Sequence, residues 1–205
     1  MEFRELVMRR KSIRKYLPDP VDQKDIYEML ELATRAANAG NQQMWRFFVI
    51  QSKDVLSRMA QAVSDATDRL AARVGQSERA SSAKKWALFF QEAPCVIAVA
   101  TQRYDSVVEK MLVQAGYSQQ QIDDLRVRPD LQSIGGCIQL LLLAAEEKGY
   151  GACWMTAPLI ARPELEEILK IKPPLSLAAL IPLGRPAEQP PLRPRKPVQE
   201  LVTYV

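Results

Sequence analysis

One segment of the chain, DLQSIGGCIQLLLLAAEEKGYG, constrains the fold more than any other. It begins with polar residues, continues through an almost wholly apolar middle, and ends in charged residues before Gly149. This pattern predicts a long helix that a glycine terminates. A helix that is apolar on nearly all sides is buried, so we expect it at the centre of the fold or in a dimer interface.

Helices and separated strands make up the rest of the chain. Periodicity predicts helices at 2–10, 23–37, 53–73 and 162–171, with Asp22 as the N-cap of the second, and strands at 46–52, 93–101, 152–156 and 176–184. We expect a polar loop at 75–85, an insertion of short helices at 102–132, and a proline-rich arm at 185–205 that ends in a strand-like LVTYV. This mixture indicates an α+β or α/β fold.

The composition excludes several kinds of function. The chain has no histidine, which removes His-containing triads and most zinc or haem sites. Catalysis must then use carboxylates, Lys, Tyr, Cys, backbone groups or a cofactor. Cys95, Cys137 and Cys153 are far apart in apolar stretches, so we interpret them as core residues.

The location of the protein is inferred from two absences in the sequence. No apolar run approaches the roughly 18 residues of a membrane span. The first ten residues also lack the apolar core of a signal peptide. We therefore expect a cytoplasmic protein with no membrane partner.

Two basic segments lie near opposite ends of the chain. Residues 9–15 carry five positive charges and residues 185–197 carry a net three, which leaves −4 on the remainder because the total is +4. Arg10 and Arg14 in the first segment, and Arg193 and Arg195 in the second, suit a phosphate through their bidentate guanidinium groups. The alternatives are a solvated basic turn and a proline-rich surface tail. An acidic body with two basic patches favours a compact anion over nucleic acid.

Two further motifs could contact a planar ligand. The amide side chains of NAGNQQMW (38–45) can donate to and accept from the edge of a heterocycle, and the glycine permits close approach. The segment GACWMTAPL (151–159) ends a strand in small residues on which a ring could lie. Taken singly, the first could be an ordinary polar loop and the second a core strand that leads into a turn.

The order and spacing of these motifs resemble the nitroreductase family of flavin-dependent oxidoreductases along nearly the whole chain. Arg10, Lys11, Ser12 and Arg14 match the RRS-x-R element of that family, and ANAGNQQMW matches its PSxxNxQPW loop. The segment KGYGACWM is similar to its G-x-G-x-x-W segment, and IPLGRPAEQPPLRPRKP to its G-x-P-x-E and basic arm. The loop departs from the pattern at Ala37, Asn38 and Met44, where Pro, Ser and Pro are usual.

The resemblance implies a fold and an assembly. The fold would be α+β, a nitroreductase-like three-layer structure with a mainly antiparallel central sheet flanked by helices, in a single domain over residues 1–205. The chain would form a homodimer in which the C-terminal arm (185–205) embraces the partner. Residues 102–132 match no motif of the family, and we expect this insertion to act as a lid that selects the substrate.

The resemblance also implies an FMN site between the two subunits. The phosphate would be held by Arg10, Lys11, Ser12, Arg193 and Arg195. Arg14 would reach the ribityl chain or the pyrimidine edge. The partner subunit would contribute Asn38, Ala39, Asn41 and Gln43, while Pro158, Leu159 and Ile160 would line one ring face. Lys85 is a candidate for a further pyrimidine contact.

The implied activity is transfer of a hydride from NADH or NADPH to an electron-poor nitroaromatic or quinone acceptor by a ping-pong mechanism. The flavin would carry the chemistry, so we expect no catalytic side chain and no metal. The alternatives are another FMN reaction, such as reductive dehalogenation, enone reduction or flavin fragmentation, and a non-catalytic flavin-binding protein. A last alternative is a small nucleic-acid-binding module, which would bind DNA or RNA with an affinity that depends strongly on salt. The acidic remainder of the chain disfavours this alternative.

Overall fold

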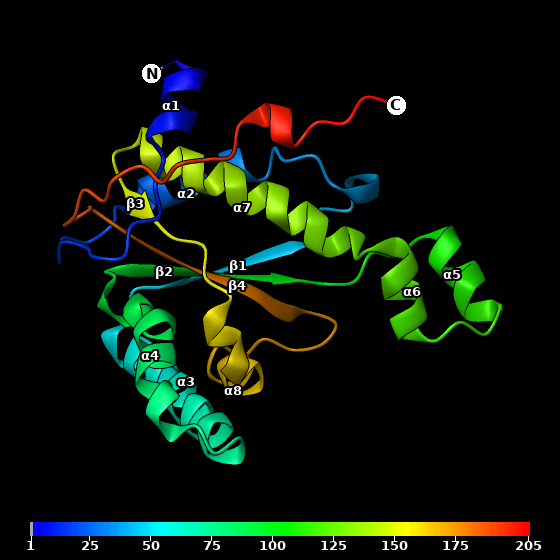
Figure 1. Cartoon of the computed structure of the whole chain (residues 1–205), viewed down its shortest axis with the longest axis horizontal. Helices are drawn as coiled ribbons and strands as arrows, with labels where there is room; N and C mark the ends of the chain where they lie inside the picture. The colour runs from blue at the N-terminus through cyan, green and yellow to red at the C-terminus, as the bar shows by residue number, and fades with distance from the viewer. Residues whose placement is uncertain (1) are drawn as a thin grey trace.

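A computed structural model describes residues 2–205 of the chain. Its centre is a four-stranded sheet with the order β1-β2-β4-β3, in which every neighbouring pair is antiparallel (Figure 1). The strands are β1 (Trp45–Ile50), β2 (Cys95–Thr101), β3 (Gly151–Ala152) and β4 (Ser176–Gly184). The predicted strand at 152–156 is reduced to this short β3 and a bridge between Met155 and Leu180.

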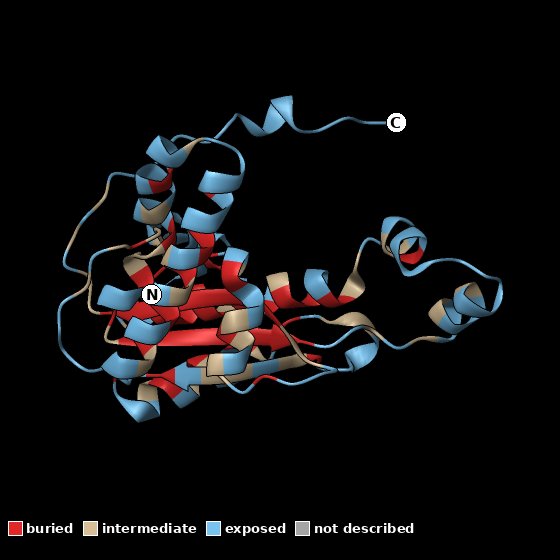
Figure 2. Ribbon diagram, turned by 90° about the horizontal axis from the view of Figure 1, so that it is seen from below, coloured by how far each residue is buried: buried red, intermediate tan, exposed pale blue. Residues whose placement is uncertain are grey.

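Helices cover both faces of the sheet and make three layers. On one face lie α2 (Gln23–Ala33) and α7 (Pro129–Glu147), and on the other lie α3 (Lys53–Arg73), α4 (Ser77–Ala87) and α8 (Arg162–Ile168) (Figures 1 and 2). All of β2 is buried, and its alternate residues serve two cores. Ile97 and Val99 face the α2–α7 layer, whereas Val96 and Ala98 face the α3–α8 layer. The predicted α+β three-layer fold is therefore confirmed.

Helix α7 is the buried helix that the apolar segment predicts. Cys137, Ile138 and Leu141 are fully buried in it. The helix starts at Pro129, where the missing N–H costs nothing, and the chain leaves it through Gly149 with φ +74°. It begins one residue before the expected segment, so residues 129–132 belong to α7 and not to the polar insertion.

The other predicted helices lie where the periodicity placed them, including α1 (Phe3–Arg9). Asp22 caps α2 by accepting a hydrogen bond from the Lys24 N–H at 2.7 Å. Helix α2 ends at Ala33, four residues before the predicted end, because the chain turns there through Thr34.

Two sequence predictions are wrong. Residues 75–85 are not a loop, because most of them lie in α4, whose buried face consists of the small residues Ala80 and Ala87. The terminal LVTYV is not a strand either. Residues 191–205 of the arm are exposed and make one 3-10 turn (Val198–Glu200). No strand within residues 2–205 pairs with LVTYV.

Helices α5 (Val107–Gln114) and α6 (Gln119–Arg126) are the short helices expected in the polar insertion. They form a segment that extends away from the sheet and its covering helices (Figures 1 and 2). We call residues 102–128 the α5–α6 segment. Ile122 of α6 is the one buried residue in these two helices.

Cys95, Cys137 and Cys153 are buried and unpaired, as the sequence predicts. Burial raises the pKa of the Cys95 and Cys137 thiols to about 12, so both are neutral core groups. Over residues 2–205 the structure contains no cluster of three potential metal-ligating side chains.

None of the helices within residues 2–205 is both long enough and apolar enough to cross a membrane.

Candidate functional site

The two basic segments of the sequence meet beside β3. After α1 the chain runs along the edge of the sheet, where Ser12 pairs with Ala152 and the Ile13 N–H donates to the Ala152 carbonyl at 3.1 Å. On its other side the Leu17 N–H donates to the Arg185 carbonyl at 2.8 Å. In return, the Ala187 N–H donates to the Lys15 carbonyl at 2.9 Å. Residues 12–17 therefore lie between β3 and the start of the C-terminal arm.

Side chains strengthen this junction. The Lys11 Nζ donates to the Pro190 carbonyl at 2.9 Å, and the Arg14 N–H donates to Glu188 Oε1 at 2.7 Å. A cavity of about 260 Å³ lies here, with Lys11 and Tyr150 among its lining residues. Arg193 and Arg195 lie further along the exposed arm, and neither donates a hydrogen bond within the described chain. Their convergence with Arg10 on one anion stays a prediction.

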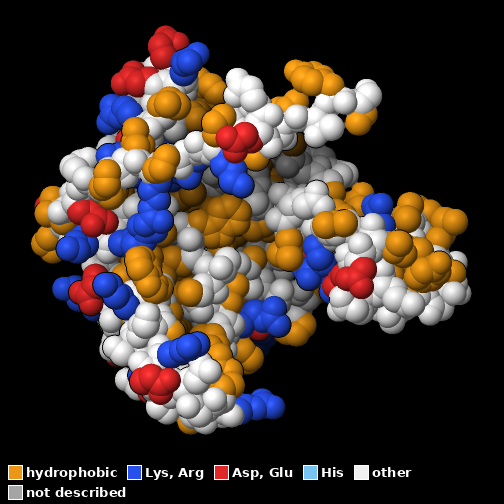
Figure 3. All heavy atoms as spheres, in the orientation of Figure 1, with side chains coloured by type: hydrophobic (Ala, Val, Ile, Leu, Met, Phe, Trp, Pro, Cys, Tyr) orange, Lys and Arg blue, Asp and Glu red, His pale blue; other side chains and the backbone are white. Residues whose placement is uncertain are grey.

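The cations at this junction lack carboxylate partners. Among the ion pairs of residues 2–205, none involves Arg10, Lys11 or Arg14. The neighbouring Arg9, in contrast, pairs with Glu146 at 3.5 Å. Lys and Arg side chains are numerous on the side of the molecule where β3 lies (Figure 3). Half-buried cations without counter-charges suit the binding of an anion.

Two groups beside these cations are neutral, the half-buried Tyr16 and the buried Cys153. The Tyr16 hydroxyl donates to the Ile13 carbonyl at 2.5 Å, and burial strongly raises its pKa. Burial also raises the pKa of the Cys153 thiol, against the smaller opposing effect of Arg14. Because neither group is ionised near neutral pH, the positive charge of the junction is not compensated by them.

Arg14 also contacts two aromatic rings that sequence reasoning missed. Its guanidinium carbon lies 5.7 Å from the centroid of the Trp86 ring and 6.0 Å from that of Phe89. The Lys85 Nζ lies 5.9 Å from the Trp86 ring, so this predicted candidate is in the same cluster. The sequence analysis missed this group of cations and aromatic rings because it predicted a loop at 75–85. The run KKWALFF, in which aromatic residues follow two lysines, could have indicated it.

Residues 38–45, which we call the amide loop, are held by contacts of their own outside the junction beside β3. The loop contains the 3-10 turn Ala39–Asn41, and Asn41 and Gln43 have positive φ values of 50° and 48°. Asn38 Oδ1 accepts from the Gln43 N–H at 2.9 Å, and the Ala39 N–H donates to Ser133 Oγ of α7 at 3.1 Å. The exposed Asn41 and Gln43 side chains make no hydrogen bond with residues 10–14 in the described chain. Their contact with a ligand from the partner subunit stays a prediction.

The same loop is tied to the base of the α5–α6 segment. The Gln42 amide nitrogen donates to the Asp105 carbonyl at 2.5 Å, and the Asp105 N–H donates to Gln42 Oε1 at 3.2 Å. Tyr104 packs against Gly40 so closely that a Cβ there would lie 3.1 Å from the Tyr104 hydroxyl. A displacement of residues 104–105 would therefore reach the amide loop directly.

Pro158, Leu159 and Ile160 lie in a 3-10 turn (Ala157–Ala161) that follows β3. Pro158 is buried, Leu159 is half-buried and Ile160 is exposed. Trp154, which is 40% exposed, lies near Gly135 of α7. The predicted ring-contacting residues thus form one continuous element, and their contact with a flavin stays a prediction.

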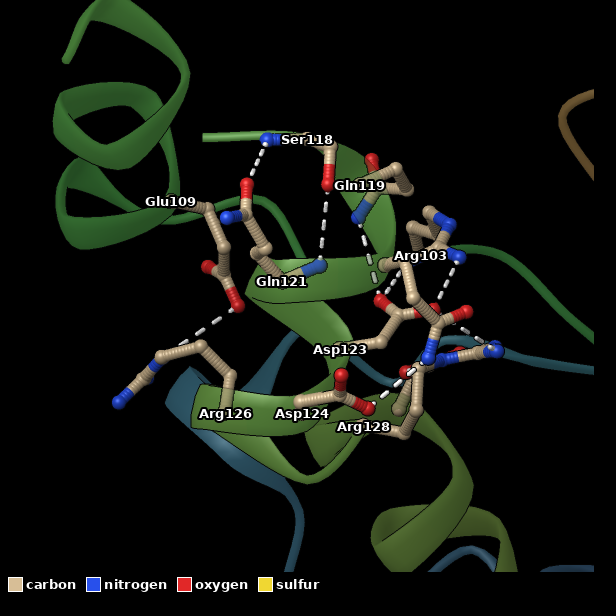
Figure 4. Close-up of polar contacts among 11 residues, drawn as sticks. Arg103, Glu109, Ser118, Gln119, Gln121, Asp123, Asp124, Arg126 and Arg128 are labelled. Carbon is tan, nitrogen blue, oxygen red and sulfur yellow. Dashed lines mark hydrogen bonds and ion pairs between the residues drawn. The ribbon is translucent and has the colours of Figure 1, made fainter. Parts of the chain in front are cut away.

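Charged contacts fix the shape of the α5–α6 segment (Figure 4). Arg103 donates two hydrogen bonds to Asp123, at 2.5 and 2.8 Å, which joins the beginning of the segment to α6. Arg128 binds the buried Asp130 in the same bidentate way, at 3.0 and 2.5 Å. Hydrogen bonding from Arg103 lowers the pKa of Asp123 to about 2, so this carboxylate is ionised at neutral pH.

The fold is of the α+β class, and the junction beside β3 places cations without ion-pair partners in the described chain at the edge of an antiparallel sheet. A sequence model described as the nitroreductase family matches residues 7–185, and the chain belongs to this family.

Individual relatives extend over the same length. The chain is 24% identical to the iodotyrosine deiodinase of Thermotoga neapolitana over 95% of this chain and 94% of that protein. It is 25% identical to the 4-nitrobenzoate reductase of Nocardioides sp. (strain LMS-CY) over 99% and 90%.

Two solved structures share the fold. A BluB-like flavoprotein from Clostridium difficile 630 superimposes with a TM-score of 0.90 at 28% identity, covering 100% of this chain and 99% of the other. A nitroreductase with bound FMN from Desulfitobacterium hafniense DCB-2 gives a TM-score of 0.71 at 19% identity, covering 98% and 96%.

Proposed function

We propose that the protein is a homodimeric, FMN-dependent oxidoreductase that takes a hydride from NADH or NADPH and reduces an electron-poor acceptor of the nitroaromatic or quinone type. The observation that carries the proposal is the meeting of residues 12–17 with residues 185–190 beside β3. Within residues 2–205 the side chains of Arg10, Lys11 and Arg14 there form no ion pair with a carboxylate. Membership of the nitroreductase family supports the redox chemistry.

The donor set at this junction fits the phosphate of FMN. Arg10 and Lys11 provide charged donors and Ser12 a hydroxyl donor. Arg193 and Arg195 of the C-terminal arm complete the set. Each charge-assisted contact of this kind contributes about 1.5–3 kcal/mol. Arg14 then reaches the ribityl chain or the pyrimidine edge, and Pro158, Leu159 and Ile160 line one ring face.

Bound FMN would supply the hydride-transfer chemistry between the nicotinamide and the acceptor. The side chains of this protein would bind and orient the cofactor. The half-buried Tyr16 and the buried Cys153 stay neutral, so they leave the positive field of Arg14 in place. The solved nitroreductase of similar fold that contains FMN supports this choice of cofactor.

The assembly is proposed to be a dimer in which the C-terminal arm covers the partner. The arm exposes Leu192, Leu201 and Tyr204 at 59, 66 and 95%. Apolar side chains in such number favour burial against another surface. In this assembly the amide loop, with Asn38, Ala39, Asn41 and Gln43, meets the cofactor of the other subunit, and the α5–α6 segment acts as the lid that selects the acceptor.

A second candidate function is reductive dehalogenation on the same cofactor. It is favoured by the similarity to the iodotyrosine deiodinase, which is as extensive as that to the 4-nitrobenzoate reductase. Non-catalytic flavin binding is separated from both candidates by the same experiment, because neither nicotinamide would then bleach the bound flavin.

The test begins with the visible absorption spectrum of the protein after loading with FMN and removal of the excess. NADH and NADPH are then added without oxygen, and the bleached protein is offered 4-nitrobenzoate, a quinone or 3-iodotyrosine. Return of the flavin spectrum with the nitro compound or quinone supports the proposal, whereas return with iodotyrosine alone selects the second candidate. A colourless protein after loading overturns both.

A further inference from the structure

We propose that Trp86, together with Phe89, positions the Arg14 guanidinium for bound FMN, and thereby makes the protein hold reduced FMN more tightly relative to oxidised FMN. This inference rests on the proposed function and adds a positioning residue to it. Trp86 lies in α4 next to Lys85, the candidate for a pyrimidine contact, and has itself been given no part in the cofactor site.

The guanidinium of Arg14 is held by three neighbours. Its Nη1 donates to the Ser12 carbonyl at 3.2 Å, and its carbon lies 5.7 Å from the Trp86 ring and 6.0 Å from the Phe89 ring. Both ring distances are within the range of cation–π attraction, which contributes about 0.5–2 kcal/mol. The Arg14 backbone is fixed separately, because its N–H donates to Glu188.

The chemical nature of these neighbours decides what the contact can do. A carboxylate would orient Arg14 and at the same time cancel its charge. Aromatic rings and a carbonyl orient it and leave the net positive charge intact. The Glu188 carboxylate accepts from the Arg14 backbone N–H at 2.7 Å but forms no ion pair with the guanidinium. Tyr16 and Cys153 have pKa values raised by burial and are uncharged at neutral pH. Within the described residues the Arg14 guanidinium is therefore a fixed cation without an ion-pair partner.

Trp86 can be examined separately from the stability of the fold. Its side chain is 50% exposed, whereas Phe89 packs against the core between the sheet and α3. Replacing Trp86 removes one wall of the Arg14 site and little buried surface. Reduced FMN carries more negative charge than oxidised FMN, so a fixed cation stabilises the reduced form selectively.

The experiment measures the dissociation constants of oxidised and reduced FMN for the full-length protein. Trp86→Leu is expected to weaken binding of reduced FMN about three- to tenfold and of oxidised FMN less than twofold. A tenfold selective loss corresponds to about 30 mV in the two-electron potential. Trp86→Phe retains a ring and should restore most of the difference. The matched control is Tyr27→Leu, which removes an exposed aromatic side chain from α2.

A double-mutant cycle with Arg14→Gln tests whether Trp86 acts through Arg14. In the Arg14→Gln background, Trp86→Leu should leave the ratio of the two dissociation constants unchanged. The inference is overturned if Trp86→Leu weakens both forms equally, or if its effect persists without Arg14. These results differ from failure of the proposed function, in which the wild-type protein binds no FMN at all.

Discussion

Gly151 and Ile13 are in contact so close that no side chain fits between them. A Cβ added at Gly151 would lie 2.6 Å from Ile13 Cγ1 and 2.7 Å from its Cβ. The contact brings the basic segment against β3, where the Ile13 N–H donates to the Ala152 carbonyl. The position of Arg10, Lys11 and Arg14 therefore depends on residue 151 of the adjacent strand being a glycine.

Gly151→Ala is expected to destabilise the protein by about 1–3 kcal/mol, because the β-branched Ile13 cannot rotate away from the added methyl group. Thermal unfolding of the variant would show the loss. The matched control is Gly136→Ala in α7, where the nearest atoms would be 3.7 Å away and the change should be neutral or stabilising. Equal melting temperatures for wild type and Gly151→Ala would contradict the prediction.

Arg10→Ala and Arg195→Ala are each expected to weaken FMN binding about 10- to 100-fold, because each removes a charge-assisted contact to the phosphate. Titration of the apoprotein with FMN measures the effect. Arg9→Ala serves as the control, since Arg9 is adjacent in sequence but paired with Glu146. Unchanged affinity in both variants would show that the two basic segments do not share an anion.

The α5–α6 segment is expected to loosen in acid. The pKa of Asp123 is lowered to about 2 from its model-compound value of 3.8, chiefly by the hydrogen bonds from Arg103. Because the pKa is depressed in the folded state, the stabilisation is present above about pH 4 and is lost as the pH falls toward 2. The protection factors of residues 107–126 against hydrogen exchange, which correct for the intrinsic pH dependence of exchange, should fall over this interval.

Asp123→Asn should remove most of that pH dependence and raise exchange of the segment at neutral pH. Asp124→Asn is the control, because within residues 2–205 the Asp124 carboxylate accepts from the Gln120 side chain alone, at 2.9 Å. A segment that exchanges at the same rate in all three proteins would show that the Arg103–Asp123 contact does not hold it.

Removal of residues 191–205 is expected to weaken the dimer and the retention of FMN together, because the exposed arm is proposed to cover the partner and carries Arg193 and Arg195. Sedimentation velocity and FMN titration measure the two effects. A variant with Arg193 and Arg195 replaced by Gln in the intact arm should lose FMN affinity but remain dimeric. A truncated protein that is fully dimeric would contradict the arm's role in assembly.

The apolar segments of the sequence predicted the core well. Helix α7, β2 and β4 are buried over most of their length, so their apolar runs are direct consequences of their positions. Helix α4 could not be recognised in this way, because Ala80 and Ala87 alone face the core and their neighbours are polar. Small residues give almost no hydrophobic periodicity, although they form helices readily.

The candidate site was predicted as a set of motifs but not as an arrangement. Residues 15–17 and 185–187 pair through backbone hydrogen bonds, which do not depend on side-chain identity and so cannot be recognised from the sequence. The contact between Arg14 and Trp86 joins residues 72 positions apart and depends on how α4 packs. Likewise, Arg103 and Arg128 meet Asp123 because of the path that the α5–α6 segment takes, and the spacing of these residues in the sequence does not predict it.

The reciprocal hydrogen bonds between Gln42 and Asp105 have a consequence for protein engineering. A library that varies the α5–α6 segment to accept new substrates will also perturb the amide loop whenever it shifts residue 105. Acceptor range and cofactor retention would then change together, and variants selected for one property would carry losses in the other. Holding residues 42 and 104–105 constant while varying 107–126 should allow the two properties to be altered independently.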